Sequence, residues 1–211
     1  TTKRNGTIVK FTPDPEIFGT NFSFSSEKLF KECQSKAYLL SGVKILWTCK
    51  KELVKNEQTS TNEVFCYPNG IIDFLNGRIP SDYLLNKIHF TGNVKLKEKN
   101  SSNLNGSINW VCNWSLNYTN FFRSYCNLIN TSDGGTHETG FWNAILKGVK
   151  SYGELVGNKK VAQIVKEDIS LNLCGIISLF ISSPTFSGQT KDKLTTQEVI
   201  KAVENSIKGL F

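Results

Sequence analysis

The sequence predicts a globular protein of mixed α/β class, and three observations lead to this prediction. Segments with the two-residue period of strands alternate along the chain with segments that have the 3.6-residue period of helices. Hydrophobic residues make up 39% of the chain and charged residues 20%, which argues against a mainly disordered protein. The length of 211 residues is enough for one large domain, or for one domain and part of another.

The N-terminal third is expected to contain a strand, a helix and a hairpin. Residues 7–11 (TIVKF) have the composition of a strand, which two prolines then stop. A helix is predicted from a serine cap at 25–26 to about Leu40. The residues expected on its buried side are Leu29, Phe30, Cys33, Ala37 and Leu40. Residues 43–49 and 63–66 have the pattern of two strands joined by a polar hairpin loop.

The middle of the chain is predicted to consist mostly of strands. A short helix over 71–75 precedes a strand at 88–90, and residues 95–106 are expected to be a polar, flexible connection. A strand with one buried face is predicted over 108–116, because apolar residues occupy every second position. These apolar residues are Ile108, Trp110, Cys112, Trp114 and Leu116. After a polar turn, residues 121–129 are expected to return as the next strand.

The longest predicted helix lies in the C-terminal part. Residues 133–135 (DGG) break the chain, and Thr136 is expected to cap a helix from 137 to about 156. Its apolar residues follow a 3.6-residue period and are Phe141, Trp142, Ile145, Leu146, Val149, Tyr152 and Leu155. A short helix is predicted near 167–173.

The loop over 183–194 carries the clearest chemical signal. It joins a buried strand at 175–182 to a last helix at about 195–209, an arrangement that can hold side chains in a fixed direction. Lys191 is a compact cation that can meet a terminal phosphate, and Gln189 can bond a phosphate oxygen. The spacing of a Walker loop is absent, and from the residues alone a solvated surface loop is the favoured interpretation.

His137 lies between Asp133 and Glu138, a group that raises the question of a catalytic site. A catalytic dyad needs a nucleophile and an orienting partner, and the sequence identifies neither. One further histidine, His89, does not make a metal site, so no metal is expected. We interpret residues 133–138 as a structural turn at the start of the helix.

The net charge of +7 permits contact with nucleic acid and leaves open a stand-alone basic nucleic-acid-binding module. Such a module needs exposed aromatic side chains, whereas the tryptophans at 47, 110, 114 and 142 lie on faces expected to be buried. The six cysteines lack regular spacing, which favours reduced thiols over a secreted, disulfide-rich adhesion domain. No stretch is apolar enough for a membrane helix, and a chain without Met is expected to be part of a longer protein.

Two motifs stand out in the C-terminal half: DGGTHETGF at 133–141 and ISLFIxxPxFxGQTKxKL at 177–194. Together they resemble the second domain of the ATPase subunit of type II topoisomerases, the family that comprises the B subunits of gyrase and of topoisomerase IV. Residues 6–18 resemble the last strand of the GHKL-type ATP-binding domain that precedes it in the family. The segments that look closer to the topoisomerase IV branch than to gyrase are 35–39, 67–70 and 152–159.

The resemblance implies a transducer domain over 21–211, preceded over 1–20 by the last strand of the ATP-binding domain and a linker. The implied fold is a two-layer α+β fold of the ribosomal-protein/GHMP-kinase type. It has a left-handed β-α-β crossover on a four-stranded sheet with helices on one side. Gln189 and Lys191 would contact the terminal phosphate of ATP, and Lys191 would also have a catalytic role. ATP and Mg²⁺ are expected only in the full-length protein and not in this chain, which should be inactive alone.

The implied enzyme is cytoplasmic, relaxes and decatenates DNA, and has no contact with a membrane, with gyrase as the alternative. Its implied partners are DNA, the A subunit of topoisomerase IV and a second copy of the B subunit. In the family this domain lines a cavity through which DNA passes, so lysines outside the apolar side of the long helix are candidates for DNA contact. These are Lys147, Lys150, Lys159 and Lys160, and a solvated helix face is the alternative.

Overall fold

The computed structural model describes residues 5–96, 104–117 and 120–210. The helices are α1 (Pro15–Phe18), α2 (Ser26–Leu39), α3 (Ile71–Asn76), α4 (Thr136–Leu155), α5 (Lys166–Ser170) and α6 (Glu198–Lys208), with short 3₁₀ helices η1 (Lys51–Leu53), η2 (Ser81–Tyr83) and η3 (Lys159–Gln163). The strands are β1 (Lys44–Thr48), β2 (Asn62–Cys66), β3 (Phe90–Leu96), β4 (Gly106–Trp114), β5 (Phe121–Cys126), β6 (Ile129–Asn130) and β7 (Leu173–Ile181). The mixed α/β class predicted from the sequence is confirmed.

The main sheet has five strands in the order β3-β4-β7-β5-β6. β7 is its central strand, antiparallel to β4 and parallel to β5. All but one of its nine residues are buried, which explains its nearly continuous apolar sequence. The fifth strand, β6, has only two residues, so the sheet extends the four-stranded arrangement that the resemblance implies.

The prediction that residues 121–129 return beside the preceding strand is wrong. β5 pairs with β7, and β7 separates it from β4. Because two parallel strands cannot be joined by a tight turn, the chain runs from β5 through α4 before it reaches β7. The β-α-β unit is therefore present, and the hand of its crossover stays a prediction.

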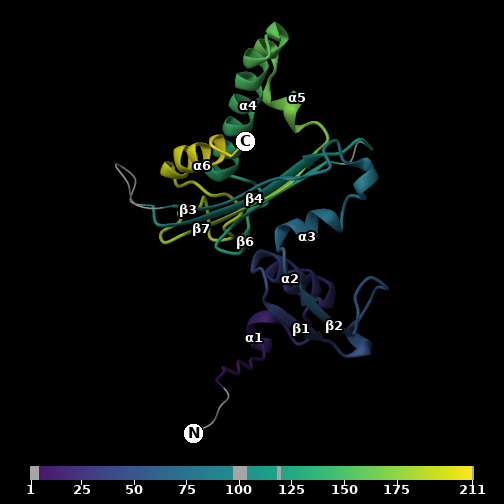
Figure 1. Cartoon of the computed structure of the whole chain (residues 1–211). Coiled ribbons are helices and arrows are strands. Elements are labelled where there is room, and N and C mark those ends of the chain that lie inside the picture. The colour runs from purple at the N-terminus through teal and green to yellow at the C-terminus, as the bar shows by residue number, and fades with distance from the viewer. Residues whose placement is uncertain (1–4, 97–103, 118–119, 211) are drawn as a thin grey trace.

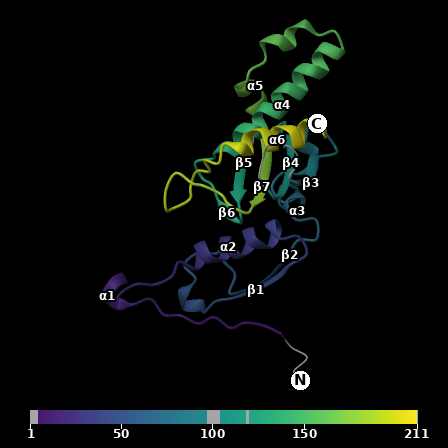
Figure 2. The same cartoon turned by 90° about the vertical axis from the view of Figure 1, so that its left-hand side faces the viewer.

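Helices cover both faces of the sheet, contrary to the expectation of helices on one side. Figures 1 and 2 show α4, α5 and α6 on one side and α2 and α3 on the other. The core under α4 and α6 includes Trp110, and the core under α2 and α3 includes Val111. Residues 108–116 consequently do not have a single buried face, because Val111 and Asn113 are as fully buried as their apolar neighbours.

The first part of the chain forms a separate small layer. Strands β1 and β2 make an antiparallel hairpin, as predicted, and pack against α2 through Phe30, whose ring centroid lies 5.7 Å from that of Trp47. The predicted serine cap of α2 is also present, because the Ser25 hydroxyl accepts a hydrogen bond from the backbone N–H of Lys28. The buried side differs from the expected one, since Leu29 is exposed and Tyr38 is buried.

The strand predicted over 7–11 is absent. Residues 5–14 have no regular secondary structure, and the side chain of Ile8 is 96% exposed. A strand needs a hydrogen-bonded neighbour, and no strand of the described residues pairs with this segment. Strand β3 also differs from the prediction, because it runs from Phe90 to Leu96 and so includes the first two residues of the connection predicted over 95–106. Residues 97–103 of that connection lie outside the described residues.

Helix α4 packs on the core of the sheet mainly along its first half. Its first half packs on the core through Phe141 and Ile145, whereas Leu155 near its end is 83% exposed. Figure 1 shows this second half extending beyond the sheet, with α5 leading back towards it. The predicted apolar side is therefore buried only as far as the sheet reaches. No helix among the described residues is both long and apolar enough to cross a membrane.

Candidate functional site

The loop between β7 and α6 is a narrow hairpin of two paired arms. Near its base the backbone N–H of Thr195 donates to the carbonyl of Thr185 at 2.8 Å. Further out the N–H of Ser187 donates to the carbonyl of Lys193 at 3.0 Å. Figure 2 shows the loop, in yellow tones between β7 and α6, extending outward from the sheet. These hydrogen bonds make the loop a defined arm with a distinct tip.

The tip brings the two predicted site residues together. It is a turn in which the N–H of Lys191 donates to the carbonyl of Gly188 at 3.2 Å, so that Gln189 lies within the turn. Both Gln189 and Lys191 are exposed. Lys191 has a φ of 63°, a left-handed conformation that costs free energy in residues other than glycine and is enriched at functional sites.

The charge at the tip is available to a ligand. The Lys191 ammonium lies 6.0 Å above the centre of the Phe186 ring, and none of the ion pairs found in the described part of the chain involves it. The neighbouring Asp192 carboxylate is directed elsewhere and accepts a hydrogen bond from the Ser132 hydroxyl at 3.3 Å. The tip therefore presents one cation and one amide to solvent, a donor set that suits phosphate oxygens.

The base of the loop is attached to the start of α4, a connection that the sequence reasoning missed. The N–H of Leu194 donates to the carbonyl of Gly134, and the N–H of Thr136 donates to the carbonyl of Leu194, both at 3.1 Å. The signal that could have revealed it is the pair of adjacent glycines, which often marks a close approach of two backbones. Thr136 is the first helical residue and not the cap; Gly135 occupies the cap position, without a side-chain hydrogen bond.

His137 belongs to a buried structural cluster. Its Nε2 lies 3.0 Å from the Thr131 hydroxyl, which in turn lies 2.6 Å from the Ser124 hydroxyl. Burial lowers the pKa of His137 to about 4, so the imidazole is neutral at pH 7. Burial also raises the pKa of the Glu138 carboxyl. This geometry supports the interpretation of residues 133–138 as a structural turn.

The four candidate DNA-contact lysines lie on the extending half of α4 and on η3, and two of them have partners within the chain. Lys147 forms an ion pair with Glu204 of α6. The Lys150 ammonium donates to the carbonyl of Ala162 at 3.3 Å. Lys159 and Lys160 are exposed at the start of η3.

The second histidine has a structural environment of its own. The His89 Nε2 lies 2.7 Å from Asn76 Oδ1, and its Nδ1 lies 3.0 Å from the side-chain nitrogen of Asn113. Within the described ranges no three His, Cys, Asp or Glu side chains are grouped so that they could hold a metal ion. None of the six cysteines, all of which lie in the described residues, forms a disulfide.

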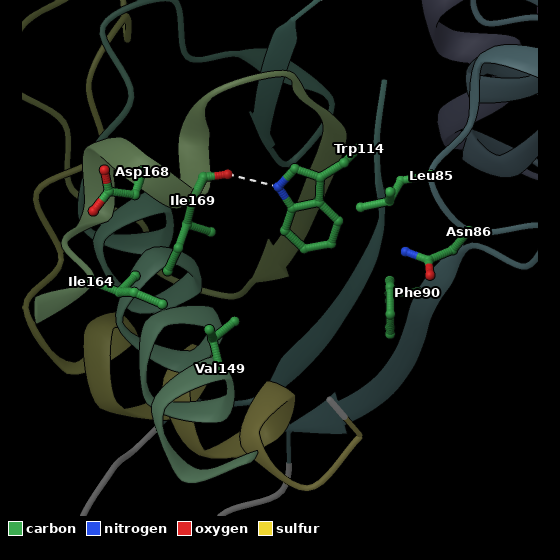
Figure 3. Close-up of a pocket in the computed structure, with 8 residues that line it drawn as sticks. All are labelled: Leu85, Asn86, Phe90, Trp114, Val149, Ile164, Asp168 and Ile169. Atoms are coloured by element: carbon green, nitrogen blue, oxygen red, sulfur yellow. Dashed lines mark hydrogen bonds between the residues drawn. The ribbon is translucent and has the colours of Figure 1, made fainter. Parts of the chain in front are cut away.

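An apolar pocket of about 340 Å³ lies between α4, α5 and the β3–β4 edge. Figure 3 shows the Trp114 indole at its wall, donating a hydrogen bond to the carbonyl of Ile169 at 2.8 Å. The other lining residues are Leu85, Asn86, Phe90, Val149, Ile164 and Asp168. Because this lining has no basic side chain, the pocket does not offer a site for the phosphates of a nucleotide.

The hairpin loop and the helix start that holds it lie in a part of the chain that a known protein family shares. The family model described as DNA gyrase B matches residues 70–211. The chain belongs to the DNA gyrase B family. Among curated members of the DNA gyrase B family, it is 43% identical over 206 residues to the B subunit of DNA topoisomerase 4 from Rickettsia bellii, covering 98% of this chain and 30% of the relative.

Other relatives in the DNA gyrase B family carry either of two names. The chain is 37% identical over 213 residues to the B subunit of DNA topoisomerase 4 from Caulobacter vibrioides, covering 99% of this chain and 30% of the relative. It is 32% identical over 217 residues to the B subunit of DNA gyrase from Streptococcus pyogenes, covering 100% of this chain and 31% of the relative. The chain thus spans about 30% of the length of the curated relatives that it matches.

Solved structures of the DNA gyrase B family have the same fold. The 43K ATPase domain of Thermus thermophilus gyrase B, in complex with an aminocoumarin, aligns with a TM-score of 0.67 and 26% identity, covering 94% of this chain and 50% of that one. The ATP-binding domain of Francisella tularensis topoisomerase IV, in complex with a small-molecule inhibitor, aligns with a TM-score of 0.68 and 25% identity, covering 92% and 49%.

Proposed function

We propose that this chain is the transducer part of the B subunit of a topoisomerase IV, which couples ATP binding and hydrolysis to DNA strand passage. Two findings support this proposal: the family membership, and the higher identity to a B subunit of topoisomerase 4 than to one of gyrase, 43% against 32%. Gyrase B is the second candidate, and the reaction of the intact enzyme separates the two, since a gyrase introduces supercoils and topoisomerase IV relaxes and decatenates.

The proposed site is the loop tip, where Gln189 and Lys191 contact the terminal phosphate of ATP. The nucleotide itself is held with Mg²⁺ by a separate ATP-binding domain of the full-length protein. Residues 1–20 are the connection to that domain, and residues 5–14 of it have no regular secondary structure in this chain. An ammonium directed at the terminal phosphate stabilises the negative charge on the transferred group. The same attraction holds the two domains in one orientation while the phosphate is present, and its loss on hydrolysis shifts the orientation.

The whole enzyme in this proposal acts in the cytoplasm on DNA. It contains the A subunit of topoisomerase IV and a second copy of the B subunit, and residues 21–211 transmit the state of the nucleotide to these partners. Lysines in the second half of α4 and on η3 contact the phosphates of the transported DNA; the candidates are Lys147, Lys150, Lys159 and Lys160. The chain alone hydrolyses no ATP, because the proposal places the remaining catalytic groups in the ATP-binding domain.

The observation that carries the proposal is the exposed Lys191 at the tip of an ordered loop, and its replacement in the full-length protein tests it. Lys191→Ala should lower ATP turnover about a hundred- to a thousand-fold, the usual cost of losing such a preorganised group. It should change the unfolding free energy by less than about 0.5 kcal/mol, because the side chain is exposed.

Lys193 provides the matched control, since it lies two residues away and is also exposed, and its carbonyl is paired with Ser187 of the opposite arm instead of lying in the turn at the tip. Lys193→Ala should leave turnover nearly unchanged. Equal losses in both variants would show that the loop acts only through bulk charge. Full turnover with Lys191→Ala would remove the phosphate-contact role.

A further inference from the structure

Gly135 lies against the backbone of the loop so closely that no other residue fits. A Cβ atom at this position would lie 2.3 Å from the carbonyl oxygen of Leu194 and 2.6 Å from its nitrogen. Both are backbone atoms, which cannot swing away as the end of a long side chain can. Gly135 also has a φ of 139°, which side-chain-bearing residues rarely adopt. The site thus requires glycine for space and for conformation.

The contacts around Gly135 join the loop to the start of α4 along four consecutive residues, from Asp133 to Thr136. Leu194 forms bridges both to Gly135 and, across the hairpin, to Phe186. One residue before Gly134, the N–H of Asp133 donates to the carbonyl of Asp192 at 2.9 Å. Asp192 directly follows Lys191, so these bonds reach the edge of the tip.

Both partners of this junction are anchored in the core. The side chain of Leu194 is buried in the core under α4 and α6, with 1% of its surface exposed. On the other side, the first turn of α4 contains the buried Thr136 and His137. A loop fixed to a buried helix start cannot reorient independently of the domain.

We propose that Asp133, Gly134 and Gly135 are the positioning element that fixes the direction of Lys191 relative to α4. This inference rests on the proposed contact of Lys191 with ATP. The junction makes the tip and α4 move as one body, so that a force on the Lys191 ammonium reaches the helix without being absorbed by bending of the loop. Gly135 is a positioning residue and contacts no nucleotide itself.

The test is Gly135→Ala in the full-length protein, with Gly157→Ala as the matched control. Gly157 lies just after the other end of α4 with a φ of 74°, and a Cβ there meets nothing within 4 Å. Both variants therefore strain a left-handed backbone, and only the first separates the loop from the helix. Gly135→Ala should lower kcat/KM for ATP at least about thirtyfold, because Lys191 is no longer held in place to contact the terminal phosphate and the charge that develops on it. Gly157→Ala should keep turnover within about twofold.

Two further measurements distinguish positioning from a general loss of structure. Hydrogen exchange of the Leu194 and Thr195 amides should accelerate about tenfold or more in Gly135→Ala, while amides of β7 such as Ile177 stay protected. The double variant with Lys191→Ala should be no slower than the slower single variant, because both changes remove the same contact. Additive losses, or an equal loss with Gly157→Ala, would overturn the proposal.

A milder variant covers the case in which Gly135→Ala does not fold. Ser132→Ala removes only the exposed hydroxyl that contacts Asp192, and it should lower kcat about threefold with faster exchange of the loop amides. Unchanged kcat and exchange in this variant would then reject the positioning role. If Lys191→Ala itself leaves turnover intact, the proposed function fails. If ATP turnover falls in Lys191→Ala but not in a Gly135→Ala protein that folds and shows faster exchange of the loop amides, only the positioning role fails.

Discussion

The imidazole of His137 is fully buried at the start of α4, and its pKa is lowered to about 4 from an ordinary value of 6.5. Between these two pH values His137 is protonated in the unfolded chain and neutral in the folded chain. The free energy of unfolding should therefore fall as the pH drops from about 6.5 to 4, by on the order of 3 kcal/mol, and level off below. Denaturant titrations across this pH range measure it.

His137→Gln is the control for this prediction, because an amide can keep the hydrogen bond to Thr131 and does not titrate. Its unfolding free energy should decline less over the same window. Glu138 acts in the opposite direction, since its raised pKa contributes stability that is lost as the pH rises above about 4.5. It is present in both proteins, so the difference between them isolates His137. Parallel pH profiles would contradict the assignment.

Single residues were predictable where their chemistry is local. The exposed positions of Gln189 and Lys191 follow from a polar loop between a buried strand and a helix, and Ser25 caps α2 as its sequence pattern predicts. The cap predicted at Thr136 was wrong, because Gly135 occupies the cap position, where only a glycine leaves room for Leu194. A contact between residues about sixty positions apart leaves no local pattern beyond the two glycines.

At the scale of elements, α4 and α6 pack across the small residue Gly140. A Cβ there would lie 2.5 Å from the carbonyl oxygen of Ile200 and 2.9 Å from the Cβ of Val203. Gly140→Ala gains about 1 kcal/mol of helix propensity but forces the helices apart, so a net loss of about 1–2 kcal/mol is expected. Thermal and denaturant unfolding of the variant measure it.

Gly209 is the control for the helix crossing, since it follows α6 with an ordinary helical φ of −81° and has nothing within 4 Å of an added Cβ. Gly209→Ala should be neutral or slightly stabilising. A Gly140→Ala protein as stable as the parent would show that the two helices do not cross as closely as described.

The second prediction at this scale concerns DNA contact by lysines in the second half of α4 and in the adjoining η3. Lys147 and Lys150 already have partners within the chain, so the double variant Lys159→Gln/Lys160→Gln should lose more DNA-stimulated ATPase of the intact enzyme than Lys147→Gln/Lys150→Gln. The slope of log affinity against log salt should fall by about two for the first pair. Unchanged stimulation in a variant lacking all four charges would reject DNA contact here.

The existence of most elements was predictable, because periodicity is a local property. The neighbours of each strand were not, since β5 pairs with a strand that lies after the longest helix. Residues 7–11 illustrate the same limit of local patterns. They have the composition of a strand but stay irregular, because no described strand pairs with them.

At the scale of the whole molecule, the described residues offer one cation and one amide at the loop tip and an apolar pocket without basic lining. A single lysine–phosphate contact contributes about 1.5–3 kcal/mol, whereas micromolar binding needs about 8 kcal/mol. Residues 1–211 alone should therefore bind ATP too weakly for calorimetry to detect at micromolar concentration. A micromolar dissociation constant would mean that this chain holds a nucleotide site of its own.

Burial on both faces of the sheet was not predictable from the period-two pattern of residues 108–116, which indicated one buried face. Trp110 and Cys112 alternate with Val111 and Asn113, and only the first pair is conspicuously apolar in a pattern with a period of two. Asn113 is buried because its amide donates to the carbonyl of Asn86, a partner that no pattern reveals. The second layer of helices thus depends on contacts that are not encoded locally.

The central position of β7 has a consequence for how the protein acquires its structure during synthesis. Gly106–Trp114 and Phe121–Cys126 leave the ribosome before Leu173–Ile181, the strand that both of them pair with. Until that strand appears, the nascent chain displays two unpaired strand edges with apolar faces, the kind of surface that chaperones bind and that aggregates form from. Closing the sheet requires pairing between distant parts of the chain, which slows folding. The time needed to translate residues 127–181 therefore sets the shortest period for which the unfinished sheet stays exposed.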